Sequence, residues 1–89
     1  MPYITQDRRD CLYMNKLPPA NAGELSYMIT QRITEYLASH PNSYQTMNDV
    51  IGAPEGAKLE FYRRVVVPYE DQKRAEHGDV YPEYYHAEQ

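Results

Sequence analysis

The chain has 89 residues, a single cysteine and a formal net charge of -4, which leaves room for one domain and none for an internal disulfide. This acidic balance disfavours general binding to a nucleic-acid backbone, because such proteins normally carry a basic face. No apolar run approaches the roughly 20 residues that span a bilayer, and the first residues lack the apolar core of a signal peptide. We therefore expect a single-domain cytoplasmic protein without a membrane partner.

Residues 1–20 are predicted to form an N-terminal segment with one short helix. Thr5 is a candidate N-cap, and two consecutive prolines stop the helix before residue 20. We expect Arg8 and Arg9 to be solvated surface charges, since exposed charges contribute little to stability. The alternative is that these arginines reach a neighbouring subunit or an anion.

The helical core is predicted to cover residues 21–78, and its clearest helix runs from about Ala22 to Ser39. Asn21 stands three residues before Glu24, which is the arrangement of a capping box at a helix start. Apolar side chains then recur at steps of three and four residues: Leu25, Met28, Ile29, Ile33, Tyr36 and Leu37. This periodicity predicts a stripe that packs in the core.

A second long helical pattern follows, with Asn42 as its predicted N-cap. Pro54 lies inside this pattern, and an interior proline removes a backbone hydrogen bond at a cost of about 3 kcal/mol. We therefore expect a kink or a one-residue break there. Gly78 is the predicted end of the last helix. Residues 79–89 show no periodicity and are predicted to form an extended tail.

The segment around Phe61 and Val65 has a wide apolar surface. A second row runs beside these two residues: Leu59, Tyr62, Val66 and Tyr69. Such a wide surface indicates contacts on two sides, one inside the chain and one with a partner chain. A short strand over Val65–Val67 is the less favoured alternative, because helical spacing precedes it.

These elements predict an all-α fold, a small bundle of three to four helices. A chain of this length buries only about 60 to 65% of its unfolded surface. Small domains without disulfides or metals commonly gain the missing burial by association. We therefore expect homo-oligomerisation to complete the core.

The sequence contains none of the common catalytic motifs, such as HExxH, GxSxG, a phosphate-binding glycine loop or a CxxC pair. The three histidines are widely separated and the cysteine is alone, which argues against a structural zinc site. We therefore predict that the protein is not an enzyme and that it uses no metal or cofactor.

The candidate ligand-binding residues are three cations and three tyrosines: Tyr27, Lys58, Tyr62, Arg63, Arg64 and Tyr69. A guanidinium grips a phosphate or carboxylate in two places, and a tyrosine ring can stack on a base. The alternative is a solvated face on which the cations pair with nearby acids: Glu55, Glu60 and Asp71. The sequence is compatible with both interpretations.

The string AGELSYMIT, followed by EGAKLEFYRRVVVPYEDQKRAEHGDVY, resembles a family of small proteins of unknown role that are common in tailed phages and prophages. Its members typically show GELNY, then RRV, PYED, K and NGDVY, and His77 stands here where they have Asn. The resemblance covers residues 22–81. It implies a phage-encoded anti-defence protein of the host cytoplasm, which binds and sequesters a nucleotide-derived immune signal without cleaving it. The alternative is a small helical adaptor or inhibitor that binds a host or phage protein.

Overall fold

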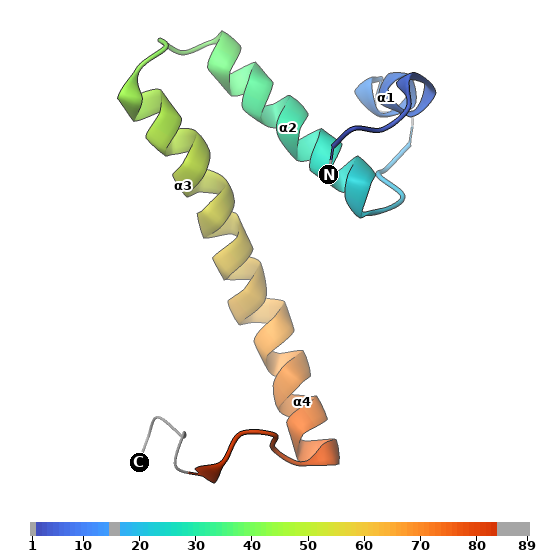
Figure 1. The fold of residues 1–89 in the computed structure, drawn as a ribbon, viewed down its shortest axis with the longest axis vertical. Helices are drawn as coiled ribbons and strands as arrows, with labels where there is room; N and C mark the ends of the chain where they lie inside the picture. Colours follow the sequence, from blue (N-terminus) through green and yellow to red (C-terminus); the bar gives the residue numbers. More distant parts are fainter. Residues whose placement is uncertain (1, 15–16, 84–89) are drawn as a thin grey trace. The chain divides into compact units, whose positions relative to one another are not determined.

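The structure is a computed structural model that describes residues 2–14 and 17–83 (Figure 1). The regular elements of these residues are all helical, which confirms the predicted all-α fold. They are α1 (Gln6–Tyr13), α2 (Ala22–Ala38), α3 (Tyr44–Phe61), a π-helical turn (Tyr62–Val66) and α4 (Val67–His77). Contacts divide the chain into two compact units, Met1–Val50 and Ile51–Gln89, which we call the N-terminal and C-terminal units.

Side-chain caps begin the helices of the N-terminal unit. The hydroxyl of Thr5 accepts a hydrogen bond from the backbone amide of Arg8, and the side chain of Asn21 accepts one from that of Glu24, so both predicted caps are confirmed. At α3 the prediction of Asn42 is wrong. The hydroxyl of Ser43, one residue later, accepts from an amide of the first helical turn, as an N-cap residue does.

The core of the N-terminal unit is small. Leu12 of α1 has no exposed surface and is the one buried apolar side chain among the described residues. The prediction that the whole apolar stripe of α2 packs in a core is wrong. Leu25 is 52% exposed, and Ile29 and Leu37 are exposed as well. The physical reason is size, because the eight-residue α1 is too short to cover all of a 17-residue helix.

A partly buried ion pair joins α1 to α2. The Nε and Nη2 atoms of Arg8 donate to the two carboxylate oxygens of Glu24 at 2.6 and 2.5 Å, and the backbone amide of Ala20 donates to the same carboxylate at 2.8 Å. The prediction that Arg8 is a solvated charge is therefore wrong. The predicted capping box is also only half formed, because Glu24 accepts from Ala20 rather than from the amide of Asn21.

These hydrogen bonds favour the ionised form of Glu24. The bond from Arg8 contributes most and the one from the Ala20 amide comes next, so that they lower the pKa of the Glu24 carboxyl from its ordinary 4.5 to about 2. Glu24 is only 5% exposed, and burial opposes this shift without cancelling it. The carboxylate therefore remains charged wherever the unit is folded near neutral pH.

A second polar contact joins α2 to the start of α3. The hydroxyl of Tyr36 donates to Oδ2 of Asp49 at 2.7 Å, and the ring of Tyr36 stacks on that of His40 with centroids 3.8 Å apart. The hydrogen bond from Tyr36, helped by one from Gln45, lowers the pKa of Asp49. The hairpin of α2 and α3 thus depends on a charged acceptor, as the contact of α1 with α2 does.

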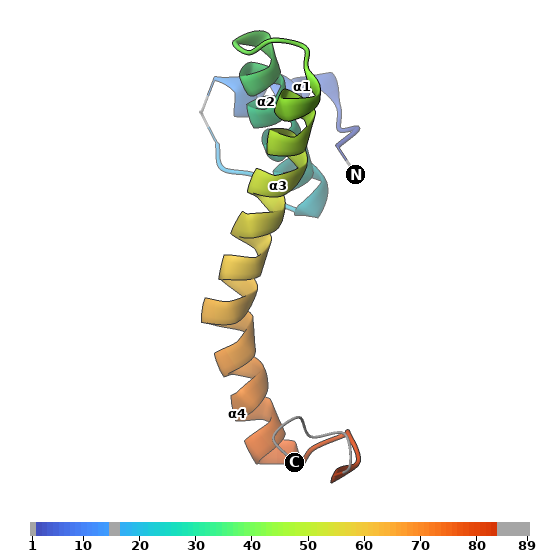
Figure 2. The same ribbon diagram turned by 90° about the vertical axis from the view of Figure 1, so that its left-hand side faces the viewer.

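In the C-terminal unit the helical path continues without interruption from Ile51 to His77 (Figure 2). Pro54 lies inside α3, so the one-residue break that we considered there does not occur. The departure from regular α-helical hydrogen bonding lies instead at the π-helical turn, where the amide of Val67 donates to the carbonyl of Tyr62, five residues earlier. Pro68 has no amide proton and its ring would crowd the carbonyl four residues earlier. A wider turn in front of the proline relieves that crowding.

The end of α4 is the predicted one. Gly78 has a φ of 90°, a conformation that residues with a Cβ rarely adopt. Its amide donates to the carbonyl of Arg74 at 2.8 Å. The predicted tail is not extended where it is described, because residues 80 and 81 bend and the amide of Tyr81 donates to Oδ1 of Asp79 at 3.0 Å. Residues 84–89 lie outside the described part of the chain.

Candidate functional site

The six predicted ligand-binding residues are divided between the two units. Tyr27 belongs to α2 of the N-terminal unit, and the other five belong to the C-terminal unit: Lys58, Tyr62, Arg63, Arg64 and Tyr69. We call these five residues the Arg/Tyr cluster. They come from the end of α3, the π-helical turn and the first turn of α4.

Tyr27 has a local role in its own unit. The guanidinium carbon of Arg9 lies 5.7 Å from the centroid of the Tyr27 ring, which is the geometry of a cation–π contact. Nε of Arg9 also donates to the carbonyl of Ile4 at 3.1 Å. The half-buried Tyr27 therefore helps hold the N-terminal segment against α2. The sequence offered no signal for this contact, because the two residues are 18 positions apart.

The three cations of the Arg/Tyr cluster are paired with carboxylates of their own helix. Nζ of Lys58 lies 3.2 Å from Glu55, and the guanidinium groups of Arg63 and Arg64 lie 3.1 and 3.3 Å from Glu60. These side chains are all exposed. The solvated face that we considered as the alternative is therefore present for these three residues. Exposed pairs are typically worth less than about 1 kcal/mol, so a ligand or partner can replace them at little cost.

The two tyrosines of the Arg/Tyr cluster also interact with neighbours along the helix. The hydroxyl of Tyr62 donates to Oε1 of Glu70 at 3.3 Å, and the negative charge of Glu70 raises the pKa of that hydroxyl. The ring of Tyr69 lies 5.5 Å from Nζ of Lys73. Both tyrosines are about half exposed or more. They offer apolar ring surface to a partner, as tyrosines at interfaces commonly do.

The π-helical turn determines which residues share a side of this helix. In a regular α-helix, side chains two turns apart are separated by seven residues, whereas the bonded pair Tyr62 and Glu70 is separated by eight. The extra residue is accommodated by the π-helical turn that begins at Tyr62. The side of the helix on which a residue lies, if it is assigned from ideal α-helical spacing, is therefore wrong by about one residue position for every residue after Val66.

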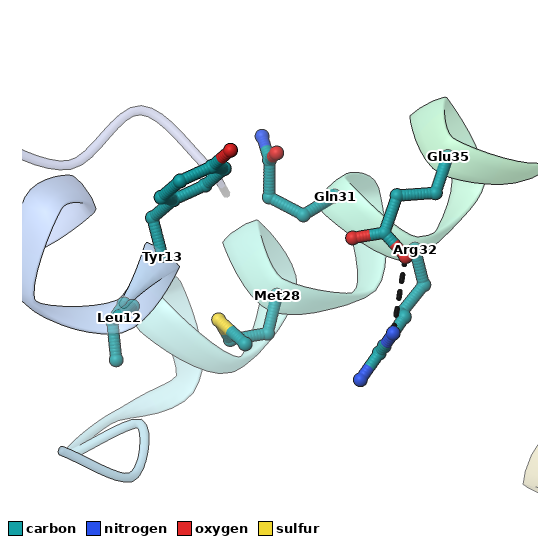
Figure 3. Close-up of a pocket in the computed structure, with 6 residues that line it drawn as sticks. All are labelled: Leu12, Tyr13, Met28, Gln31, Arg32 and Glu35. Carbon is teal, nitrogen blue, oxygen red and sulfur yellow. Dashed lines mark hydrogen bonds and ion pairs between the residues drawn. The ribbon is translucent and has the colours of Figure 1, made fainter. Parts of the chain in front are cut away.

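A shallow hollow lies in the N-terminal unit, between α1 and α2. Its volume is about 290 Å³ and six side chains line it: Leu12, Tyr13, Met28, Gln31, Arg32 and Glu35 (Figure 3). Nη1 of Arg32 donates to Glu35 at 3.0 Å on its rim. None of the six lining residues is a Ser, Thr, Cys, Lys or His.

Within residues 2–14 and 17–83, no group of three His, Cys, Asp or Glu side chains is placed to hold a metal ion. Over the same residues, no helix is long and apolar enough to cross a membrane. The Arg/Tyr cluster presents exposed tyrosine rings and ion pairs at the surface of its helix.

Comparison with known proteins gives a family but no activity. A model of the family described as "Domain of unknown function (DUF6899)" matches residues 1–80. No curated protein matches the chain, and no solved structure matches it either. The match extends to the N-terminal segment, so α1 and its contact with α2 fall within the matched region.

Proposed function

We propose that this chain, which belongs to the family described as "Domain of unknown function (DUF6899)", is a non-catalytic helical adaptor that works as a homo-oligomer and binds a protein partner. The observation that carries this proposal is the exposure of the C-terminal unit. None of its described residues is buried, although its helix carries many apolar side chains. Exposed apolar surface on this scale is typical of association surfaces.

The charges of the C-terminal unit favour a protein over a phosphate-rich ligand. Residues 51–83 contain five basic and seven acidic side chains, so their net charge is 5 − 7 = −2. Each cation of the Arg/Tyr cluster already has a carboxylate partner. A mixed surface of this kind complements another mixed protein surface, and complementary charges across such an interface set its specificity. The partner would be a host or phage protein.

Sequestration of a nucleotide-derived immune signal is the second candidate function, and the tyrosines favour it. Tyr62 and Tyr69 present rings that can stack on a base, while Arg63 and Arg64 share the single carboxylate of Glu60 and so leave one positive charge in excess. A single convex helix cannot enclose a nucleotide, so this function needs an oligomer. It would make the protein a phage anti-defence factor of the host cytoplasm that holds the signal without cleaving it.

The double substitution Arg63→Ala and Arg64→Ala tests both candidates. We expect it to weaken binding of the protein partner at least tenfold, because arginines at the centre of an interface commonly contribute more than about 1.4 kcal/mol. The measurement is native mass spectrometry and titration of the protein purified from bacterial cells, with and without a panel of cyclic and ADP-ribose-type nucleotides. Discrete nucleotide mass on the oligomer would instead establish the second candidate.

Arg74→Ala is the matched control for this experiment. Arg74 is exposed on the same helix and pairs with Asp71 at 3.6 Å, but it lies outside the Arg/Tyr cluster. We expect this variant to bind as the unchanged protein does. If the double substitution and the control had the same effect, or if neither protein nor nucleotide bound, the role of the Arg/Tyr cluster would be overturned.

A further inference from the structure

We propose that a second copy of this chain covers an apolar row on the C-terminal unit, and that the two helices run antiparallel. The row consists of five apolar or aromatic residues and one lysine: Ile51, Pro54, Lys58, Phe61, Val65 and Tyr69. This inference rests on the self-association in the proposed function and adds the surface, the direction and the register of the two helices.

The spacing of the row is that of a helix–helix seam. Its first five members follow one another at steps of three, four, three and four residues, which is the pattern that keeps side chains facing a partner helix. The last step, from Val65 to Tyr69, is again four. The π-helical turn absorbs that extra residue, as it does for the hydrogen bond between Tyr62 and Glu70. The row therefore stays on one side of the helix through the turn.

The apolar members of the row are left open by the rest of the unit. Ile51 is 74% exposed, Phe61 59% and Val65 52%. From Ile51 to Tyr69 the row extends over about 27 Å at 1.5 Å per residue. An apolar surface of this length on a helix is costly in water and is stabilised when a matching helix covers it.

The charge of Lys58 selects the antiparallel direction. In a parallel pair in register, Lys58 would face Lys58 of the second copy, and the exposed pair that each lysine makes with its own Glu55 offsets that like-charge contact only weakly. In an antiparallel pair, each seam position faces a different one. When the two antiparallel helices are aligned so that every row residue faces a row residue of the other copy, Lys58 lies opposite Phe61 of the second copy. The ammonium group then lies over an aromatic ring, a favourable cation–π arrangement.

The pair of helices covers Lys58 and Tyr69 of the Arg/Tyr cluster and leaves its two arginines accessible. At 100° per residue, Glu60 lies about 200° around the helix from Lys58, and Arg63 and Arg64 both contact Glu60. These two ion pairs therefore lie on the side away from the row. Self-association and binding of another protein through the arginines can then occur together.

Substitutions at Phe61 test the row, the direction and the register. Phe61→Lys puts a second cation beside Lys58 of the other copy, and we expect it to raise the dimer dissociation constant at least a hundredfold. Phe61→Glu puts a carboxylate there, and we expect a clearly smaller loss. A parallel pair would place each new charge opposite its own copy, so both variants would then be equally damaging. Sedimentation equilibrium over a range of concentrations measures the constants.

Leu59→Lys is the matched control. Leu59 is 55% exposed on the same helix, but it lies about 100° around the helix from Lys58 on the side away from Phe61. We expect its dissociation constant to stay within about threefold of that of the unchanged chain. Equal losses from Leu59→Lys and Phe61→Lys would overturn the assignment of the row.

A pair of spin labels measures the direction independently. A label on Gln72→Cys in a Cys11→Ser background is expected to give a distance of about 35 Å between copies, because each label lies about 12 residues from the centre of the pair. A parallel pair would bring the labels within about 20 Å, which is two helix diameters. A distance in that range would overturn the antiparallel direction.

The failure of this inference differs from the failure of the proposed function. If the chain stays monomeric at all concentrations but binds a partner through Arg63 and Arg64, the antiparallel pairing of two copies is wrong. The row would then be covered by another protein. A chain that dimerises as described, yet keeps every partner when both arginines are removed, would overturn the role of the Arg/Tyr cluster and leave the seam intact.

Discussion

Replacing Leu12 with alanine is expected to detach α1 from α2. Leu12 has no exposed surface, and a fully buried leucine truncated to alanine typically costs 2 to 5 kcal/mol, or about 3 kcal/mol at a site of this kind. The helix it belongs to has eight residues, too few to remain helical alone in water. Hydrogen exchange of the α1 amides should therefore become faster by more than a hundredfold, since every 1.4 kcal/mol is a factor of ten.

Leu25→Ala makes the same chemical change at an exposed position of the same unit and serves as the control. More than half of the Leu25 side chain is exposed to water, so its loss should change stability by no more than about 0.5 kcal/mol. Equal acceleration of exchange in both variants would contradict the assignment of Leu12 as the centre of this small core. It would indicate that a second molecule covers Leu25.

Local signals were sufficient to predict α2 and the end of α4. The N-cap and the three- and four-residue periodicity placed α2 at Ala22 to Ser39, one residue longer than the observed helix. Gly78 ends α4 because a positive φ at that point requires a residue without a Cβ. Such features depend only on residues within a turn or two, so a single sequence contains the information for them.

Contacts over longer distances along the chain could not be predicted in the same way. Arg8 and Glu24 are 16 positions apart, and nothing in the periodicity indicates that they meet. The widened turn before Pro68 shifts the register of α4, and the sequence indicates the proline without indicating how the helix accommodates it. At the candidate site, the pairing of Lys58 with Glu55 follows from helical spacing. The exposure of the Arg/Tyr cluster could not be predicted, because it depends on which elements cover the helix.

The carboxylate of Glu24 is expected to make the N-terminal unit sensitive to acid. Its pKa is lowered to about 2 in the folded unit, against 4.5 when it is not held by Arg8 and Ala20. A group whose pKa is lowered by folding contributes stability that is fully present above the unfolded pKa. Its contribution should therefore be constant above about pH 5 and should decline as the pH falls from 4.5 towards 2.

Glu24→Gln should remove this pH dependence together with the stability it reflects. The amide can still accept from Ala20, but it loses the charge that Arg8 requires and presents donors to a guanidinium that has no acceptor capacity. Thermal unfolding between pH 2 and 7 measures the effect, and the variant should be less stable than the unchanged chain at pH 7 and nearly equal to it at pH 2. The stability of the variant should still decline to a smaller extent as the pH falls, because the pKa of Asp49 is also lowered in the folded unit.

Glu35→Gln provides the comparison, because Glu35 pairs with Arg32 on an exposed surface of the same unit. This variant should keep the acid transition of the unchanged chain, since exposed pairs change stability little. If the stability of Glu24→Gln declined with acid as steeply as that of the unchanged chain, groups other than Glu24 would have to bind the protons that are taken up on unfolding. The contact between α1 and α2 would then depend on Leu12 and on the contact of Arg9 with Tyr27, and Arg8→Met would be tolerated as well as any surface substitution.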